Sequence, residues 1–365
     1  MRDVVGLVIF CSVAVAASVV ASVVAGCERE STTPVVVVYV SADRAVASPV
    51  LEAFTRRTGI DVRPLYDTEA TKTTGLANRV RREQSRPRAD VFWSSEPFAV
   101  EQLAAAGLLQ PTVHPDLDGH PAEWRRPDDR WFAFAGRARV IAFDPERLPL
   151  EDRPRQWTDL ADPRWRGEIA MADPRFGTTR GHVGAIATAG SIGEPPMSYP
   201  GWLEGLAAND IRLLTGGNAA TVDAVLRGEV LLGLTDSDDV LAARRRGGDI
   251  KSVAPRHRGP GILGGGTLLI PNAVGMITGA PHPEPAAVLV AFLASSEVER
   301  LLHRSPSGNQ PVAHPLADGE GTIGDESLAA DPWRISIPAV AGGMDEAVDA
   351  AMEALSESTR SERRR

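Results

Sequence analysis

Three aspartates stand within four positions of the stretch GLTDSDDVLAA, at Asp236, Asp238 and Asp239. An apolar run that is typical of a strand precedes them, and the helix-like run VLAARRR follows. Hard cations such as Fe3+, Ca2+ and Mn2+ prefer carboxylate oxygens, so the cluster could ligate a metal ion. The stretch is not an EF-hand, because the glycine and the distant glutamate of that loop are missing. Acids at a helix start also cap N–H groups and favour the helix dipole, which explains one or two of the three.

The acids come at the end of a predicted strand, and polar residues occupy the same place after other strands. In open α/β sheets, ligands bind beyond the carboxyl ends of the strands. The residues in these loops include Ser41, Asp43, Thr68, Ser95 and Glu96, then Thr178, Thr179, Arg180 and Asn218. We therefore expect a cleft in which Asp238 and Asp239 face two acids of the other lip. These two are Asp43 and Glu96, and the four together form an oxygen-only set that suits a metal ion.

A second kind of ligand fits the same loops. Hydroxyl groups and helix N-termini form anion sites, and the segments FGTTRG and GGNAAT place both on one lobe. The residues expected to bind such a ligand are Ser41, Thr68, Ser95, Thr178, Thr179, Arg180 and Asn218. Helix capping explains each of them alone, whereas the two segments together favour a phosphonate, a phosphate or a carboxylate. A metal ion and an anion therefore both remain open.

The sequence lacks the usual signs of an enzyme. It contains no GxSxG elbow, no HExxH pair and no Walker A loop. Of the seven histidines, only His182 falls near a strand-end loop, where a lone histidine more often packs than reacts. The formal net charge of −9, without a long block of Lys and Arg, argues against nucleic-acid binding. We predict no catalytic residues and no required cofactor.

The N-terminus is typical of an export signal. Arg2 precedes an apolar run over residues 4–24, and VAGC ends this region at Cys27. Small residues directly before a cysteine resemble the lipobox of bacterial lipoproteins, in which cleavage leaves a lipid-modified cysteine at the N-terminus. The alternative is a plain transmembrane anchor, since about 20 apolar residues span a bilayer. We predict a signal peptide over 1–26, lipidation of Cys27, a tether over 27–33 and a periplasmic, lipid-anchored body without further cysteines.

Strand-like and helix-like segments alternate along the rest of the chain. Strands are predicted over 35–40, 60–67, 89–95, 168–174, 211–216 and 230–236, and helices over 48–59, 73–84, 97–109, 178–190 and 218–229. This β-α order predicts parallel, doubly wound sheets. The next segments are predicted to be paired strands over 266–279, a long helix over 284–303 and a disordered tail over 356–365. With 365 residues, the chain is long enough for two α/β lobes, joined by crossings near 137–143 and 264–271.

The order of these motifs resembles that of the ferric-ion-binding solute receptors of ABC importers. The resemblance covers residues 34–312 and lies in VVVVYVSADRAVASPVLEAFTRRTGIDV, ADVFWSSEPFAVEQLAAAGLL, GGNAATVDAVLRGEVLLGLTDSDD, GTLLIPNAVGMITGAPHPEPAAVLVAFL and SPSGNQPV. It implies the type II periplasmic-binding-protein fold, an α/β clamshell of two lobes with a hinge. We expect lobe 1 over 34–137 and 264–312, lobe 2 over 138–263, and a C-terminal helical segment and tail over 313–365. The resemblance also implies an ABC permease and its ATPase as partners and Fe3+ as the transported ligand, and we expect a monomer.

This chain departs from the family at the ligands. Ferric-binding members carry two adjacent tyrosines where this chain has Asp238 and Asp239, and a histidine where it has Asp43. Glu96 matches a glutamate of the family when one residue is inserted in the loop after the third strand. The four acids could still bind iron, together with a small anion, or they could contact an amine, since the wider family includes receptors for thiamine, polyamines and phosphonates. Further alternatives are a lipoprotein hydrolase with Glu96 and Asp238 as acid and base, and a lipoprotein that binds a protein partner.

Overall fold

The computed structural model describes residues 33–67, 74–149, 151–257, 266–314 and 332–362. Within it, Val35–Arg365 form one compact unit. Cys27, Thr68 and the N-terminal apolar run, on which several predictions rest, lie outside the described residues. In the described part of the chain, no helix combines the length and the apolar character that a membrane span requires.

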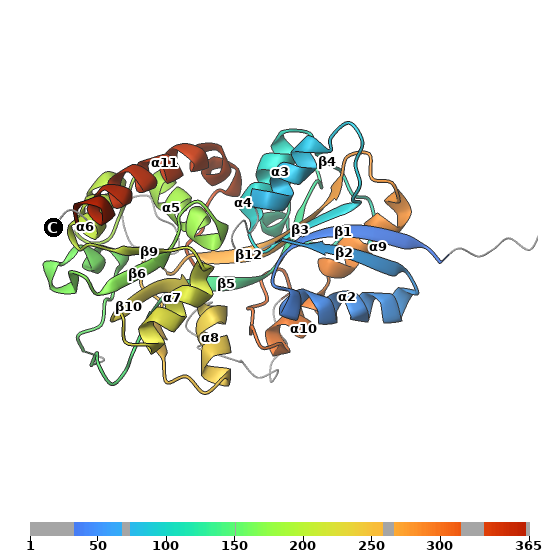
Figure 1. Ribbon diagram of the computed structural model, residues 1–365. Helices are drawn as coiled ribbons and strands as arrows, with labels where there is room; N and C mark the ends of the chain where they lie inside the picture. Colours follow the sequence, from blue (N-terminus) through green and yellow to red (C-terminus); the bar gives the residue numbers. More distant parts are fainter. Residues whose placement is uncertain (1–32, 68–73, 150, 258–265, 315–331, 363–365) are drawn as a thin grey trace, which may run out of the picture. The chain divides into compact units, whose positions relative to one another are not determined.

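Ten strands of the described chain form one mixed sheet (Figure 1). The strands are β1 (Val35–Ser41), β2 (Asp61–Tyr66), β3 (Val91–Ser94), β4 (Leu109–Gln110), β5 (Phe132–Phe143), β6 (Ile169–Ala172), β9 (Arg212–Leu214), β10 (Leu232–Asp236), β11 (Lys251–Val253) and β12 (Leu269–Ile277). Their order is β2-β1-β3-β12-β5-β10-β6-β9, with β4 paired to β12 and β11 paired to β5. Two short strands, β7 (Ser191–Ile192) and β8 (Met197–Ser198), pair with each other. The six separate strands predicted from the sequence are confirmed.

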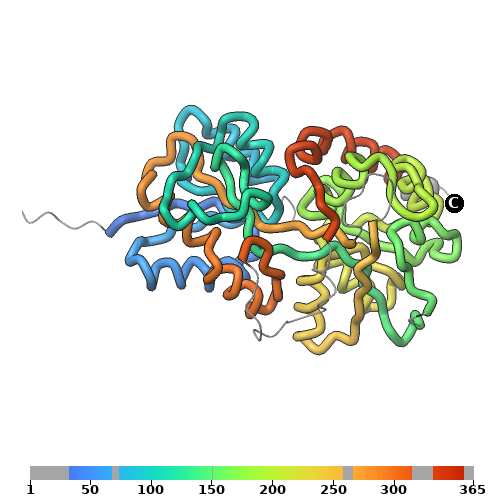
Figure 2. The backbone as a smooth tube through the Cα atoms, turned by 180° about the vertical axis from the view of Figure 1, so that it is seen from behind, coloured from blue at the N-terminus to red at the C-terminus, as the bar shows by residue number. Residues whose placement is uncertain are grey.

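The central strands β12 and β5 join two halves of the sheet. β1 is parallel to β2 and β3, and β6 is parallel to β9 and β10, as the β-α order predicts. Residues 132–138 of β5 pair with β12, whereas residues 139–143 pair with β10. The chain therefore passes within β5 from the first half (β2, β1, β3, β12, β4) to the second half (β10, β6, β9, β11). Figure 2 shows β5 and β12 running side by side between the halves.

The paired strands predicted over 266–279 are wrong. Residues of this segment form the single strand β12, all of which is buried. β12 runs antiparallel to both β3 and β5, so it has a neighbour on each edge. A continuous apolar run suits such a central strand, because both of its faces are covered.

Helices cover both faces of the sheet (Figure 1). They are α2 (Arg44–Thr58), α3 (Thr74–Arg82), α4 (Pro97–Ala105), α5 (Gly177–Ala189), α6 (Tyr199–Ala208), α7 (Gly217–Leu226), α8 (Ser237–Arg245), α9 (Pro283–Leu293), α10 (Ser296–Arg304) and α11 (Ile337–Glu362). Short 3-10 turns are η2 (Pro115–Leu117), η3 (Ala122–Trp124), η4 (Trp157–Ala161) and η5 (Pro163–Trp165). The single helix predicted over 284–303 is wrong, because Ser295 caps α10 by accepting a hydrogen bond from Val298 N at 3.4 Å. The disordered tail is also wrong up to residue 362, where α11 ends.

The buried apolar side chains form clusters that differ between the two faces. On one face, a single cluster includes Leu103 of α4, Val183 of α5 and Met344 of α11, and it therefore extends over both halves. On the other face, Val38 of β1 and Val222 of α7 belong to two separate clusters, one for each half. The two halves are thus joined by apolar packing on the face that carries α11.

Candidate functional site

A pocket of about 230 Å³ lies where strand ends of the two halves meet. Asp43 and Ser95, which follow β1 and β3, line it from the first half. Arg137 of β5 and the starts of α5, α7 and α8 line it from the second side. One water needs about 10–15 Å³ of such volume. The pocket therefore has room for a solute of several atoms.

The three aspartates of the acidic stretch lie together in this pocket. One carboxylate oxygen from each of Asp236, Asp238 and Asp239 lies within 4.8 Å of the other two. Asp236 ends β10 and precedes α8, but its side chain makes no capping hydrogen bond. Asp238 and Asp239 belong to the first turn of α8 and are half-buried. Capping by Asp236 therefore does not account for its presence.

Asp236 is held by a buried network instead. Its Oδ1 lies 2.7 Å from Arg139 Nη1, and its Oδ2 accepts hydrogen bonds from Asn218 Nδ2 at 2.8 Å and from the Thr178 hydroxyl. Arg139 is fully buried, and Asp236 is 2% exposed. The two residues are direct partners across the β5–β10 pair, so the strand register itself brings them together. Asp236 is thus the internal counter-charge of a core arginine.

A second arginine brings positive charge to the pocket wall. Arg137 Nε lies 3.4 Å from Asp238 Oδ2 and 3.9 Å from Asp236 Oδ2. Arg137 is 7% exposed, and its Nη1 atom is buried without a hydrogen-bond partner in the described structure. A buried guanidinium donor without a partner is costly unless a ligand or water satisfies it. Arg137 can therefore meet an anionic group of a bound solute.

Charge balance favours a cation in the pocket. Asp173, which also lines the pocket, is paired with Arg175. When all groups are ionised, the other four carboxylates against two guanidinium groups leave a net charge of −2, from Asp43, Asp236, Asp238, Asp239, Arg137 and Arg139. Like charges about 4.8 Å apart repel by roughly 3 kcal/mol at an effective dielectric constant of 20. The two arginines relieve only part of this repulsion, and a bound cation would relieve the remainder.

The predicted acids of the first half lie in different surroundings. Asp43 lines the pocket and is exposed, and its side chain makes no capping bond at the start of α2. Glu96 is buried and caps α4 by accepting hydrogen bonds from Phe98 N at 2.6 Å and Ala99 N at 3.2 Å. Burial raises the pKa of Glu96, while Arg180, these backbone bonds and Arg137 act against the rise. Glu96 does not line the pocket, because its carboxylate is turned into its own helix.

The predicted anion-binding residues also divide into those that line the pocket and those that do not. Thr178, Thr179, Asn218 and Ser95 line the pocket. Thr179 donates to Asn218 Oδ1 at 3.2 Å, and the donors of Thr178 and Asn218 reach Asp236. An internal carboxylate thus occupies donors that the sequence suggested for a free anion.

Two residues of the predicted anion set lie outside the pocket lining. Ser41 is buried and donates to Asp67 Oδ2 at 3.0 Å. Arg180 pairs with Asp345 of α11 at 2.6 Å. Both therefore have structural partners in place of the predicted ligand, and Thr68 cannot be placed because it is not among the described residues.

Sequence reasoning missed Arg137, Arg139 and Asp173 as residues of this region. The first two alternate in the apolar run FAFAGRARVIAF, and charged residues in a buried strand are rare unless paired. That alternation was the available signal. Asp173 follows β6 and accepts from Arg175 Nε at 2.9 Å. Burial alone would raise the pKa of Asp173, but the Arg175 side-chain and backbone hydrogen bonds lower it overall.

The chain matches one family of known sequences over most of its length. The profile described as bacterial extracellular solute-binding protein matches residues 36–305. The major ferric iron-binding protein of Neisseria meningitidis (serogroup A) is 30% identical over 277 residues, which cover 73% of this chain and 78% of that protein.

Solved structures resemble the whole α/β unit. Iron-bound HitA from Pseudomonas aeruginosa gives a TM-score of 0.72 at 24% identity and covers 88% of this chain and 99% of its own. The periplasmic binding protein AfuA from Actinobacillus pleuropneumoniae, with exogenous fructose-6-phosphate bound, gives 0.73 at 19% identity, with coverages of 89% and 99%. These likenesses show the fold, and the predicted type II clamshell is confirmed.

Proposed function

The chain belongs to the bacterial extracellular solute-binding proteins, and we propose that it is the receptor of an ABC importer whose cargo is ferric iron. The observation that carries the proposal is the gathering of Asp238, Asp239 and Asp43 around one pocket with an excess of negative charge. Fe3+ is a hard cation that prefers oxygen ligands. The relative named for ferric iron in Neisseria meningitidis supports the same cargo.

In this proposal the two walls of the pocket supply different ligands. Asp238 and Asp239 bind the ion from the start of α8, and Asp43, which lines the same pocket, contacts it from the first half. Asp236 remains paired with Arg139 and stabilises the wall of the pocket that α8 and β5 form. Because the pocket is far larger than one ion, the iron arrives with a small oxyanion that Arg137 and Thr179 contact.

A second candidate cargo is an organic solute with an amine and an acidic group. Ala172, Phe176 and Leu214 give the pocket an apolar wall that a coordinated ion does not need. Arg137 beside Asp238 offers opposite charges 3.4 Å apart, which suits a zwitterion. Such a solute would place its ammonium group on the aspartates and its anionic group on Arg137.

A thermal-shift panel separates the two cargoes. Residues 28–365, which keep the compact unit Val35–Arg365, are heated with ferric citrate, Fe3+ with phosphate, phosphonates and polyamines. Iron at 100 times its dissociation constant should stabilise by about 2.7 kcal/mol, a rise of about 5 °C in melting temperature. Asp238→Asn should abolish the rise, whereas Asp223→Asn, on α7 outside the pocket lining, should keep it. A rise only with phosphonates or amines would replace iron as the cargo.

We also propose that Cys27 carries a lipid and that the lobes divide at the predicted boundaries, 34–137 with 264–312 and 138–263. The VAGC motif supports the lipid anchor. Expression of the full chain with a radiolabelled fatty acid should label the protein and place it in the membrane fraction. Cys27→Ala should lose the label; retention of the label would contradict lipidation at this residue.

A further inference from the structure

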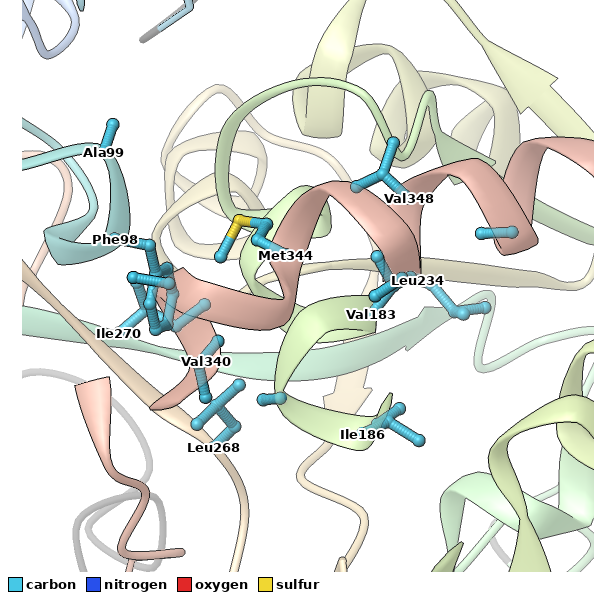
Figure 3. Close-up of a cluster of buried hydrophobic side chains, with 14 of the residues drawn as sticks. Phe98, Ala99, Val183, Ile186, Leu234, Leu268, Ile270, Val340, Met344 and Val348 are labelled. Carbon is cyan, nitrogen blue, oxygen red and sulfur yellow. The ribbon is translucent and has the colours of Figure 1, made fainter. Parts of the chain in front are cut away.

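Two glycines of α5 let two other helices approach it closely. A Cβ atom added to Gly181 would overlap the ring of Phe98 from α4. A Cβ atom added to Gly184 would lie 3.3 Å from both Met344 Cε and Val340 Cγ1 of α11. α5 therefore touches the first half of the sheet through Gly181 and the C-terminal helix through Gly184. Figure 3 shows Phe98 of α4 with Val340 and Met344 of α11 in one cluster of buried apolar side chains.

α11 contacts helices that belong to both halves. Gln102 Nε2 of α4 donates to Ala341 O at 3.0 Å, and the Tyr199 hydroxyl of α6 donates to Ala347 O at 2.6 Å. The early turns of α11 therefore hold α4, and the next turns hold α6, as Figure 1 also shows. A single helix thus bridges the first half and the second half.

A charged group adds to the bridge. Asp345 of α11 pairs with Arg180 of α5 and also interacts with Arg81 of α3, on the first half. Burial and the charge of Arg180 lower the pKa of Arg81, and Asp345 opposes this effect. Asp345 is largely exposed, so its ion pair contributes little compared with the apolar packing.

The bridge and the pocket involve the same two helices, α4 and α5. Ser95, just before α4, and Thr178, in the first turn of α5, line the pocket from the two halves. Phe98 and Gly181 each stand three residues further along these helices. Separating the pocket walls must therefore separate Phe98 from Gly181. The same motion pulls α4 away from α11 and divides the apolar cluster that joins the halves on this face.

We propose that Phe98, Gln102, Gly181, Val340, Ala341 and Met344 form an interlobe latch, which holds the two halves closed and must release when the pocket opens. Only the biological role of the latch, release during solute binding, rests on the proposed receptor function. Its state is measured without any solute, so a failure to bind iron would leave the latch result valid. Because apolar packing of buried side chains is close, the latch has two states, engaged and released.

Spin labels can report the latch directly. Cys11 and Cys27 are the only cysteines, so residues 28–365 contain none, and Glu52→Cys on α2 with Glu204→Cys on α6 gives a single exposed pair across the halves. Pulsed electron paramagnetic resonance then gives the distribution of distances between the two spin labels in the solute-free protein. Gly181→Ala drives a methyl group between α4 and α5 and should shift the distribution to a second, displaced distance. Gly343→Ala on α11, where an added Cβ atom meets nothing within 4 Å, gains the same helix propensity and should keep the wild-type distribution.

A second pair of variants tests the latch without adding any atoms to the core. Gln102→Ala and Tyr199→Phe each remove one hydrogen bond to a carbonyl of α11, the first across the halves and the second within one half. Gln102→Ala should raise the ratio of open to closed protein by roughly 2- to 10-fold, and Tyr199→Phe should not. Equal distributions for Gly181→Ala and Gly343→Ala, together with equal effects of Gln102→Ala and Tyr199→Phe, would overturn the latch.

Discussion

Arg139 and Asp236 face each other across β5 and β10, with Arg139 Nη1 2.7 Å from Asp236 Oδ1 in a fully buried setting. Removing one charge of a buried pair leaves the other without compensation, which costs about 3–5 kcal/mol. We predict that Asp236→Asn lowers the free energy of unfolding by this amount in guanidinium melts. Asp223→Asn, whose ion pair with Arg246 is exposed, should change it by less than about 1 kcal/mol. A loss below 1 kcal/mol for Asp236→Asn would contradict the role of this pair.

Two buried histidines predict a pH dependence of stability. His182 Nε2 lies 2.9 Å from His257 Nε2, and because Gly266 O accepts from His257 Nδ1, His182 must be the donor of the pair. Burial, opposed by the Gly266 hydrogen bond and aided by Arg139, lowers the pKa of His257 to about 3. Burial, Arg139 and His257 lower the pKa of His182 well below its usual value. The folded protein therefore keeps both rings neutral in mildly acidic solution.

The direction in which stability changes with pH follows from the unfolded chain, in which histidine titrates near pH 6.5. The unfolded chain takes up protons below about pH 6.5 while the folded protein does not, so stability is fully present above that pH. For His257, the free energy of unfolding should fall by about 1.4 kcal/mol per pH unit as the pH drops below 6.5 towards 3, and His182 should add a loss in the same direction. Guanidinium midpoints measured from about pH 7 to pH 4 test this. His257→Gln should reduce the slope, and parallel curves for both proteins would refute the assignment.

Asp43 provides a test of the first-half wall. It is exposed, and ion pairs or hydrogen bonds of exposed side chains contribute little, so Asp43→Asn should change the free energy of unfolding by less than about 1 kcal/mol. If Asp43 is a ligand of the metal ion, the same change should weaken Fe3+ binding by about tenfold or more, because a lost charge-assisted contact is worth roughly 1.5–3 kcal/mol. Isothermal titration with ferric citrate measures both affinity and stoichiometry. Unchanged affinity would remove Asp43 from the site.

A change at Arg137 should affect binding of the metal ion and binding of its accompanying anion in opposite directions. Its Nε lies 3.4 Å from Asp238 Oδ2, so its charge opposes a cation there and attracts an anion. Arg137→Gln should therefore weaken binding of ferric citrate. It should also strengthen binding of a cation that carries no anion, for which Ga3+ at acidic pH is a redox-inert probe. The opposite pattern, in which both affinities fall together, would show that Arg137 only supports the fold of the pocket.

The β-α order predicted which loops meet at the pocket, but not which side chains enter it. Asp238 and Asp239 after β10 and Thr178 in the first turn of α5 follow from the rule that carboxyl ends of strands share an edge. Glu96 occupies an equivalent loop, yet its carboxylate caps α4. The topology predicts the position of the backbone of a loop residue. The direction of its side chain depends also on its rotamer and on nearby N–H groups that it can accept hydrogen bonds from.

Long-range packing was beyond the sequence pattern. Arg139 reaches Asp236 only through the register of β5 with β10, which no local periodicity specifies. α11 was expected as a helical segment, but its contacts with Gln102 of α4, Gly184 of α5 and Tyr199 of α6 involve residues far apart in the sequence, which no local pattern specifies. The lobe boundaries and the ligand residues themselves stay predictions.

The central claim is that Asp238 and Asp239 bind ferric iron, and metal content after loading tests it most directly. Residues 28–365 are incubated with ferric citrate, freed of unbound metal by gel filtration and analysed for iron by mass spectrometry. The account predicts one iron per chain for the wild type and for Asp223→Asn, and none for the double variant Asp238→Asn with Asp239→Asn. Equal iron in the double variant and the wild type, or none in either, would contradict it.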